Sequence, residues 1–208
     1  MQLFSDNFSD GEVIPVEFAF GKPGDPVALS NNRNPHLAWS EIPTGAKSLV
    51  LTCVDPDVPS KPDDVNQAGR MVPADLPRAE FVHWVMTDIP ADCHVIEAGA
   101  CSNGIAARGK RHPAGPRGAR QGINDYTGWF ANDADMAGDY YGYDGPCPPW
   151  NDSIVHHYHF SVFALDCASL GLDGRFTLAD ARKAMQGHVL AQTGLVGLYS
   201  LNPRVSAA

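Results

Sequence analysis

Three apolar segments, separated by long stretches rich in glycine and proline, restrict this chain to a mainly β architecture. Residues 48–54, 81–86 and 156–166 are rich in β-branched and aromatic side chains, which favour strands. Between them lie many of the 20 glycines and 17 prolines in a chain of 208 residues, and these predict many turns. We therefore expect one mainly β domain over residues 1–208, with long loops and its first strong strand buried on both faces.

One segment near the C-terminus has the periodicity of a helix. Apolar residues recur at helical spacing within residues 178–192, namely Leu178, Ala181, Met185, Val189 and Leu190. Thr177 suits the N-cap, with Asp180 three residues further on. Gly194 can close the helix at its C-terminus. We expect a C-terminal helix followed by a last strand over residues 195–199.

The composition excludes several classes of function. The chain has 24 acidic and 15 basic residues and a net charge of −9, which disfavours nucleic-acid binding. No stretch approaches the roughly 18 apolar residues needed to span a bilayer, and the N-terminus lacks the pattern of a signal peptide. We therefore expect a cytoplasmic protein without a transmembrane segment.

The cysteine pattern predicts neither a disulfide framework nor a zinc ribbon. There are five cysteines at irregular spacings, and no two of them form a CxxC pair. Cys53 and Cys167 lie in or beside apolar segments, so we expect both to act as small buried hydrophobic residues. No cofactor and no metal site is predicted.

Ionisable side chains occur at or near the ends of the three strand segments. Asp55 and Asp57 follow the first segment, His83 lies within the second, and His156 begins the third. Because alternate side chains of a strand point to opposite faces, His156 and Tyr158 share one face. A sheet can therefore bring these groups together at one edge.

The same alternation bears on a possible metal centre. His157 and His159 fall on the opposite face of the third segment, which argues against a cluster of three histidines. On the second segment, Phe81, His83 and Val85 are expected to share a face. The sequence has no HExxH and no GxSxG motif, so a hydrolase is the weakest of the functional hypotheses.

The residue types at this edge suit a small anion. A neutral histidine offers one ring N–H and a protonated histidine offers two, while tyrosine adds a hydroxyl donor. Asp55 can orient an imidazole and stabilise its charge. Gly145, beside a proline-rich turn, can offer a backbone N–H close to a ligand. Charge-assisted hydrogen bonds to a phosphate or carboxylate are each worth about 1.5–3 kcal/mol.

Several motifs occur in a characteristic order along the chain. They are LVLTCVDPDVPS at 49–60, FVHWVMTDIP at 81–90, GINDYTGW at 122–129, GYDGPCPP at 142–149, HHYHFSVFALD at 156–166 and AQTGLVGLYSLNP at 191–203. Together these motifs resemble the phosphatidylethanolamine-binding protein family, in particular its bacterial Raf-kinase-inhibitor-like branch. The resemblance covers most of the chain from Leu37 onward.

The resemblance implies an antiparallel β-sandwich with a helix near the C-terminus and a small surface pocket for phosphate-like or carboxylate-like groups. The matched pocket positions are Asp55, Asp57, His83, Gly145, Pro146, His156 and Tyr158. It also implies a cis peptide bond between Val58 and Pro59. His157 stands where the family commonly has arginine, so ligand affinity is expected to depend more strongly on pH.

These observations favour a non-enzymatic protein that binds a small anionic ligand such as a phosphate, a lipid headgroup or a carboxylate. The alternative is a regulatory interaction protein, a kinase or protease inhibitor, that acts through the long loops at 60–80 and 99–122. Basic residues between Arg108 and Arg120 can dock an acidic partner. Bacterial members of the resembled family suggest a homodimer.

Overall fold

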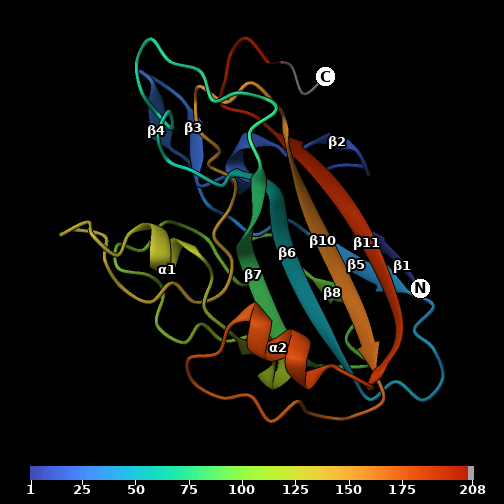
Figure 1. The fold of residues 1–208 in the computed structure, drawn as a ribbon. Helices are drawn as coiled ribbons and strands as arrows, with labels where there is room; N and C mark the ends of the chain where they lie inside the picture. The colour runs from blue at the N-terminus through green and yellow to red at the C-terminus, as the bar shows by residue number, and fades with distance from the viewer. Residues whose placement is uncertain (206–208) are drawn as a thin grey trace.

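Four long strands form the middle of the largest sheet and carry most of the candidate site residues (Figure 1). The computed structural model describes residues 1–205. The long strands are β6 (Ser48–Pro59), β7 (Arg78–Pro90), β10 (His156–Leu165) and β11 (Val189–Tyr199). Two short strands, β2 (Glu12–Val13) and β9 (Arg120–Gln121), complete the order β2-β11-β10-β6-β7-β9.

The remaining elements are short. A second sheet has the order β1-β5-β8, and β3 pairs with β4 in a two-stranded sheet. Their bounds are β1 (Gln2–Phe4), β3 (Gly21–Pro23), β4 (Val27–Leu29), β5 (Leu37–Ser40) and β8 (Val95–Ile96). The α-helices are α1 (Tyr126–Trp129) and α2 (Leu178–Ala184), and 3₁₀ turns occupy Val16–Phe18 and Pro116–Gly118.

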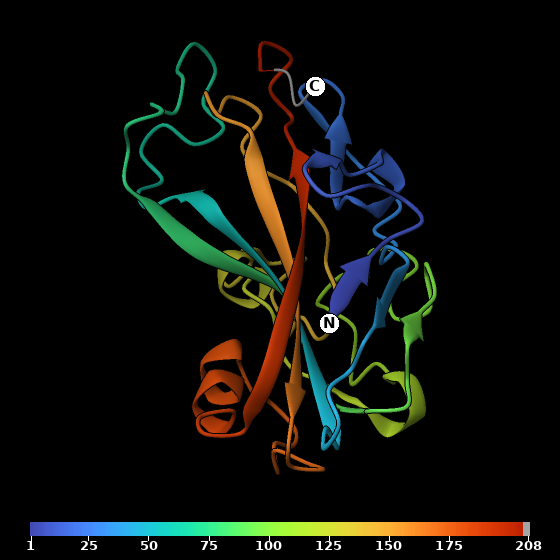
Figure 2. The same cartoon turned by 90° about the vertical axis from the view of Figure 1, so that its right-hand side faces the viewer.

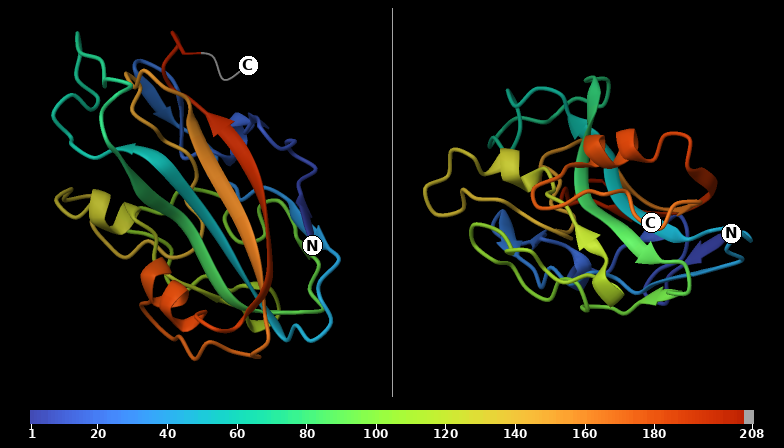
Figure 3. Two further views of the ribbon diagram at one scale, coloured as in Figure 1. Left: turned by 45° about the vertical axis from the view of Figure 1, so that its right-hand side comes forward. Right: turned by 90° about the horizontal axis from the view of Figure 1, so that it is seen from below.

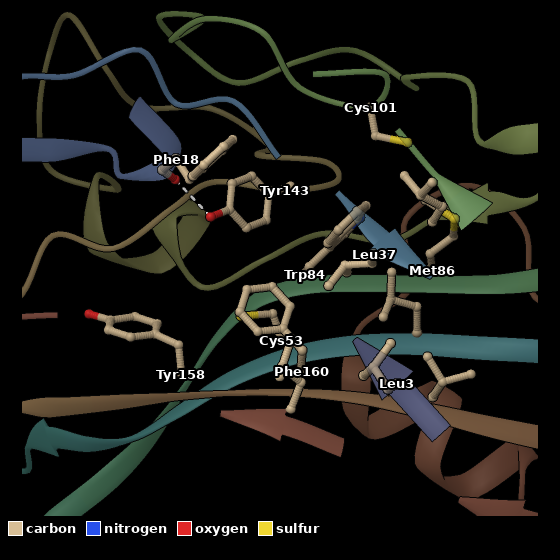
Figure 4. Packing of buried hydrophobic residues seen from close by; sticks show 14 of the residues in the cluster. Leu3, Phe18, Leu37, Cys53, Trp84, Met86, Cys101, Tyr143, Tyr158 and Phe160 are labelled. Carbon is tan, nitrogen blue, oxygen red and sulfur yellow. Dashed lines mark hydrogen bonds between the residues drawn. The ribbon is translucent and has the colours of Figure 1, made fainter. Parts of the chain in front are cut away.

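The main hydrophobic core lies between the six-stranded and three-stranded sheets (Figures 2 and 4). Leu3, Trp39 and Ile96 come from the smaller sheet, while Trp84 and Phe160 come from the larger one. All five side chains are at most 8 % exposed. Burying this apolar surface from both sheets is the main term that holds the two layers together.

On the other face of the large sheet, α2 packs against the lower end of the strands (Figure 2). Val54, Val82 and Val85 of the sheet pack against Leu178 and Ala181 of the helix. In contrast, α1 lies beyond β7, on the side away from β11 (Figures 1 and 3). These positions leave the end of the sheet near the start of β10 to be closed by loops.

The mainly β prediction is confirmed, but the expectation of purely antiparallel sheets is wrong at one edge. β2 runs parallel to β11, with Glu12 opposite Gly197 and Val13 opposite Leu198. The other strand pairs of the described chain are antiparallel.

The expected helix is present but shorter than its apolar pattern indicates. Thr177 forms a capping box with Asp180, as the sequence predicts. The helix ends at Ala184, and Gly187 then adopts a positive φ of 81° that a helix does not accommodate. Val189 pairs with Leu165 of β10, so it begins a strand instead of continuing the helix. Strand pairing therefore overrides the helical periodicity here.

A β-bulge at His83 changes the predicted faces of β7. Trp84 pairs with Cys53 and Val82 pairs with Val54, so one extra residue of β7 lies between the two pairs. Val82 and Val85 both face α2, whereas Trp84 faces the main core. The expectation that Val85 shares a face with His83 is therefore wrong, because the bulge shifts the alternation by one residue.

The segment after the first strong strand also differs from expectation. β6 does not end before the Asp-Pro-Asp motif but continues through Pro59 and pairs there with Arg78. The expected cis bond between Val58 and Pro59 is wrong, since the cis bond of the described chain lies between Asp25 and Pro26. Residues 55–59 are therefore held by pairing with β7.

Candidate functional site

A cavity of about 470 Å³ opens at the end of the sheet where β10 begins. Its floor contains Asp55 of β6, His83 of β7 and Tyr158 of β10, so three neighbouring strands each contribute one polar group. The ring centroids of His83 and Tyr158 are 5.1 Å apart. Of the four groups expected to meet at one edge of the sheet, the structure brings Asp55, His83 and Tyr158 to the cavity, whereas His156 does not line it.

The walls of the cavity are apolar. Phe20, Tyr126 and Phe130 form one wall, in which Tyr126 lies with ring centroids 4.7 Å from Phe20 and 5.7 Å from Phe130. Across the cavity, Pro62 and Val65 of the loop after β6 contribute a second apolar surface. The site therefore combines a polar floor with walls suited to an aromatic or aliphatic group.

His83 is held in one orientation by the backbone. Its ring Nδ1–H donates to the carbonyl of Asp144 across 2.7 Å, which leaves Nε2 as the ring nitrogen available to a ligand. Burial lowers the pKa of His83, although Asp55 and the bond to Asp144 oppose this in part. At neutral pH the ring is neutral, so Nε2 is an acceptor until a proton is supplied.

Tyr158 supplies a hydroxyl to the same floor. The side chain is 1 % exposed and lines the cavity, and its hydroxyl bonds to no residue within 1–205. Burial and the nearby Asp55 carboxylate raise its pKa well above the usual range, so the phenol stays protonated and can donate.

Behind the floor, Asp55 belongs to a buried chain of ionic groups. Its Oδ2 accepts from His156 Nδ1 across 2.7 Å, and His156 Nε2 donates to Asp152 Oδ2 across 3.1 Å. Arg78 then binds both oxygens of Asp152, at 2.6 and 3.1 Å. Burial lowers the pKa of His156, but its bonds to both carboxylates outweigh this and raise the pKa to about 9. His156 is therefore charged at neutral pH.

This network of ionic groups balances the negative charge of Asp55 in the cavity floor. Two carboxylates, Asp55 and Asp152, face two cations, His156 and Arg78. Because the four formal charges sum to zero, the floor does not repel an anion as an isolated Asp55 would. His156 itself is fully buried and does not line the cavity.

The other predicted positions also lie outside the cavity wall. Asp57 turns away and accepts from both the backbone N–H and the ring Nδ1 of His157, each across 2.8 Å. Gly145 donates its N–H to Asn32 Oδ1 across 2.8 Å, so this donor is already used. A Cβ at Gly145 would lie 2.1 Å from the carbonyl oxygen of Phe18, which explains the glycine.

Two further residues of this proline-rich turn, Pro146 and Cys147, contribute to the site. The carbonyl of Pro146 accepts from the N–H groups of Phe20 and Gly21, at 2.9 and 3.0 Å, and so fixes the aromatic wall. Cys147 lines the cavity, and its backbone N–H has no acceptor in the described part of the chain.

Comparison with known proteins identifies the family. The family model described as phosphatidylethanolamine-binding protein matches residues 4–200. This chain belongs to the phosphatidylethanolamine-binding protein family. The resemblance seen in the sequence motifs is thereby confirmed, and none of the helices within residues 1–205 is long and apolar enough to cross a membrane.

Relatives of this family member occur in bacteria and archaea. It is 35% identical over 199 residues to a UPF0098 protein of Methanothermobacter thermautotrophicus, covering 96% of this chain and 98% of the relative. It is 31% identical over 201 residues to a UPF0098 protein of Aquifex aeolicus, covering 96% and 88%. The crystal structure of Escherichia coli YbcL, described as a new member of the mammalian PEBP family, aligns with a TM-score of 0.69 at 26% identity, covering 96% and 97%.

Sequence reasoning missed most of the apolar wall in this family member. Phe20 is distant in sequence from the strands whose residues form the floor, although it lines the same cavity. Tyr126 lies in α1, and Phe130 directly follows it. The one local signal was the GINDYTGW motif, which contains Tyr126. Its role depends on a hydrogen bond from the Tyr126 hydroxyl to the carbonyl of Gly145 across 2.8 Å, which only the folded chain brings together.

Proposed function

We propose that this protein is a non-enzymatic binding protein whose cavity holds a small ligand with a phosphate or carboxylate group and an apolar body. One observation carries the proposal. The unpaired His83 Nε2 and Tyr158 hydroxyl lie in the floor of a cavity whose carboxylate, Asp55, is neutralised by buried His156.

The protonation state of His83 makes binding depend on pH. A neutral ring accepts at Nε2, so an anionic oxygen needs a proton on either the ring or the ligand. A phosphate monoester has its second pKa near 6 and can donate that proton as a monoanion. Affinity for a phosphate should therefore rise as the pH falls from about 8 to about 6.

The thiol of Cys147, a residue that lines the cavity, is not an activated nucleophile. Burial raises the pKa of Cys147 to about 11, so the thiol is protonated at neutral pH. A protonated thiol is a poor nucleophile. Both ring nitrogens of His156 are occupied by carboxylates, so it is not free to act as a general base.

The proposal is tested by titrating the protein with phenyl phosphate and, separately, with inorganic phosphate, while the ring signals of the histidines are followed by NMR. The His83 signals should shift with both probes, and phenyl phosphate should bind more tightly because its ring enters the apolar walls. His83→Ala should abolish binding, whereas His157→Ala, which changes an exposed ring paired with Asp57, should not. If the His83 signals of the wild type remain unmoved by both probes, the proposal is wrong.

A docking function for the 99–122 loop has less support. Lys110 Nζ lies 2.7 Å from buried Asp144. Arg117 and Arg120 each have a nitrogen 2.6 Å from a carboxylate oxygen, of Asp92 and Asp173 respectively. Because these cations are already paired within the chain, they offer little net positive charge to an acidic partner.

A further inference from the structure

A second group of ligating side chains lies at the opposite end of β10 from the cavity. Asp166 and Cys167 follow the last residue of β10, and His188 precedes the first residue of β11. A carboxylate oxygen, the Sγ atom and a ring nitrogen of these three residues all lie within 4.8 Å of one another. This end of the sheet is at the bottom of Figure 1, where β10 ends beside α2.

The backbone holds these three residues in place. Asp166 donates its N–H to the carbonyl of His188 across 3.0 Å, which continues the pairing of β10 with β11. The carbonyl of Cys167 accepts from the hydroxyl of Ser48 across 2.6 Å. His188 Nδ1 lies 2.7 Å from Asp166 Oδ1, so the imidazole already points at the carboxylate.

We propose that Asp166, Cys167 and His188 bind one zinc ion. One sulfur, one nitrogen and one oxygen donor form a set that zinc accepts, and three protein ligands plus water complete a tetrahedron. Bonds of about 2.0–2.3 Å hold tetrahedral donors roughly 3.3–3.6 Å apart. The donor atoms here lie within 4.8 Å of one another, with His188 Nδ1 and Asp166 Oδ1 2.7 Å apart. The Asp166 and His188 side chains are 48% and 46% exposed, so the ion and its water can enter from solvent.

Binding replaces existing contacts without any redox step. Zinc forms bonds to Cys167 Sγ, His188 Nδ1 and an Asp166 oxygen, and the thiol proton leaves to solvent. The proton of His188 then resides on Nε2, and the bond from Nδ1 to Asp166 is lost. The thiolate and the carboxylate together balance the charge of the ion. Cys167, expected as a buried hydrophobic residue, is in fact only partly buried.

The bound ion would link residues 166 and 188, which lie at the two ends of the segment that contains α2. Residues 166 and 188 flank this segment, and the ion would fix their separation. β10 has 10 residues, so the site lies roughly 30 Å from the start of the strand and the cavity. Zinc binding is therefore independent of the ligand proposed for the cavity.

The test is a titration of the metal-free, reduced full chain with Co²⁺, followed by competition with Zn²⁺. One equivalent of Co²⁺ should give visible bands of a tetrahedral centre and a near-ultraviolet sulfur-to-cobalt band, and Zn²⁺ should remove both. Cys167→Ser should abolish the sulfur-to-cobalt band. His188→Ala should weaken Zn²⁺ affinity by about 10- to 100-fold or more, since even an outer-shell partner has an effect of that size.

A matched control is provided by His157→Ala. His157 and Asp57 form another partly exposed pair, 2.8 Å apart, that is not among the three-residue groups able to hold a metal ion in the described chain. This variant should bind Co²⁺ and Zn²⁺ as the wild type does. A wild-type spectrum without the sulfur-to-cobalt band, or the same band in Cys167→Ser, would overturn the proposal. Because His188 is exposed, its variant tests the site even if the cysteine variant folds poorly.

Discussion

His156 donates from Nδ1 to Asp55 Oδ2 across 2.7 Å, and the imidazole is fully buried behind the cavity floor. Its Nε2 lies 3.1 Å from Asp152, so both ring nitrogens face carboxylate oxygens and both carry protons. This bond orients Asp55, which lines the cavity, and pairs its negative charge with a cation. His156 therefore acts on the candidate site through Asp55.

Replacing His156 with alanine should strongly destabilise the protein. The substitution leaves Asp55 buried without its cation, and breaking a buried ion pair costs about 3–5 kcal/mol. Urea unfolding monitored by fluorescence measures the free energy of unfolding. His157→Ala removes an exposed pair and should cost about 0–1 kcal/mol. Equal losses in the two variants would contradict the role assigned to His156.

The same histidine predicts a loss of stability at high pH. The pKa of His156 is raised to about 9 in the folded protein, from about 6.5 when unfolded. Its contribution is therefore fully present below pH 6.5 and is lost as the pH rises through about 9, with a size on the order of 3 kcal/mol. Unfolding free energies measured from about pH 6 to about pH 10 should show this decline, and His156→Ala should lack it. An NMR titration giving His156 a pKa below 7 would rule the explanation out.

Replacing Tyr158 with phenylalanine should affect ligand binding but not folding. The hydroxyl bonds to no described residue, so its removal should change the unfolding free energy by less than about 0.5 kcal/mol. A lost hydrogen bond to the ligand is worth about 0.5–1.5 kcal/mol, which weakens phenyl phosphate binding by about 2- to 10-fold. Calorimetric titration measures the affinity. Unchanged affinity would exclude the hydroxyl from the ligand contacts.

The capping box at the start of α2 gives a prediction about local stability. Thr177 Oγ1 accepts from the N–H of Asp180, and the Asp180 carboxylate accepts from the N–H of Thr177. Thr177→Ala should cost about 1 kcal/mol of unfolding free energy. Asp180→Ala and the double variant complete a thermodynamic cycle. Strictly additive costs would show that the two bonds do not cooperate.

Regular local patterns could be predicted from the sequence. In β10, His156 and Tyr158 point inward while His157 and His159 are exposed, because side chains of an uninterrupted strand alternate strictly. The N-cap at Thr177 was also predictable, since capping depends on residues within a single turn.

Local sequence patterns give a wrong secondary structure where pairing with a distant strand overrides them. Val189 continues the helical periodicity of α2, yet it pairs with Leu165 of β10. The bulge at His83 is likewise set by the pairing of β7 with β6, and it changes which neighbours share a face. Pairing between strands is a long-range contact, so neither result follows from nearby residues.

Sequence patterns alone established the family motifs, the mainly β class and the alternation that places His156 and Tyr158 on one face of β10. Tertiary packing was needed to establish that Tyr158 reaches the cavity while His156 lies behind Asp55. It also decided that Asn32 uses the N–H of Gly145 from 113 residues away. Alternation and capping are properties of neighbouring residues, whereas access to a cavity depends on which distant backbone and loop groups pack around it.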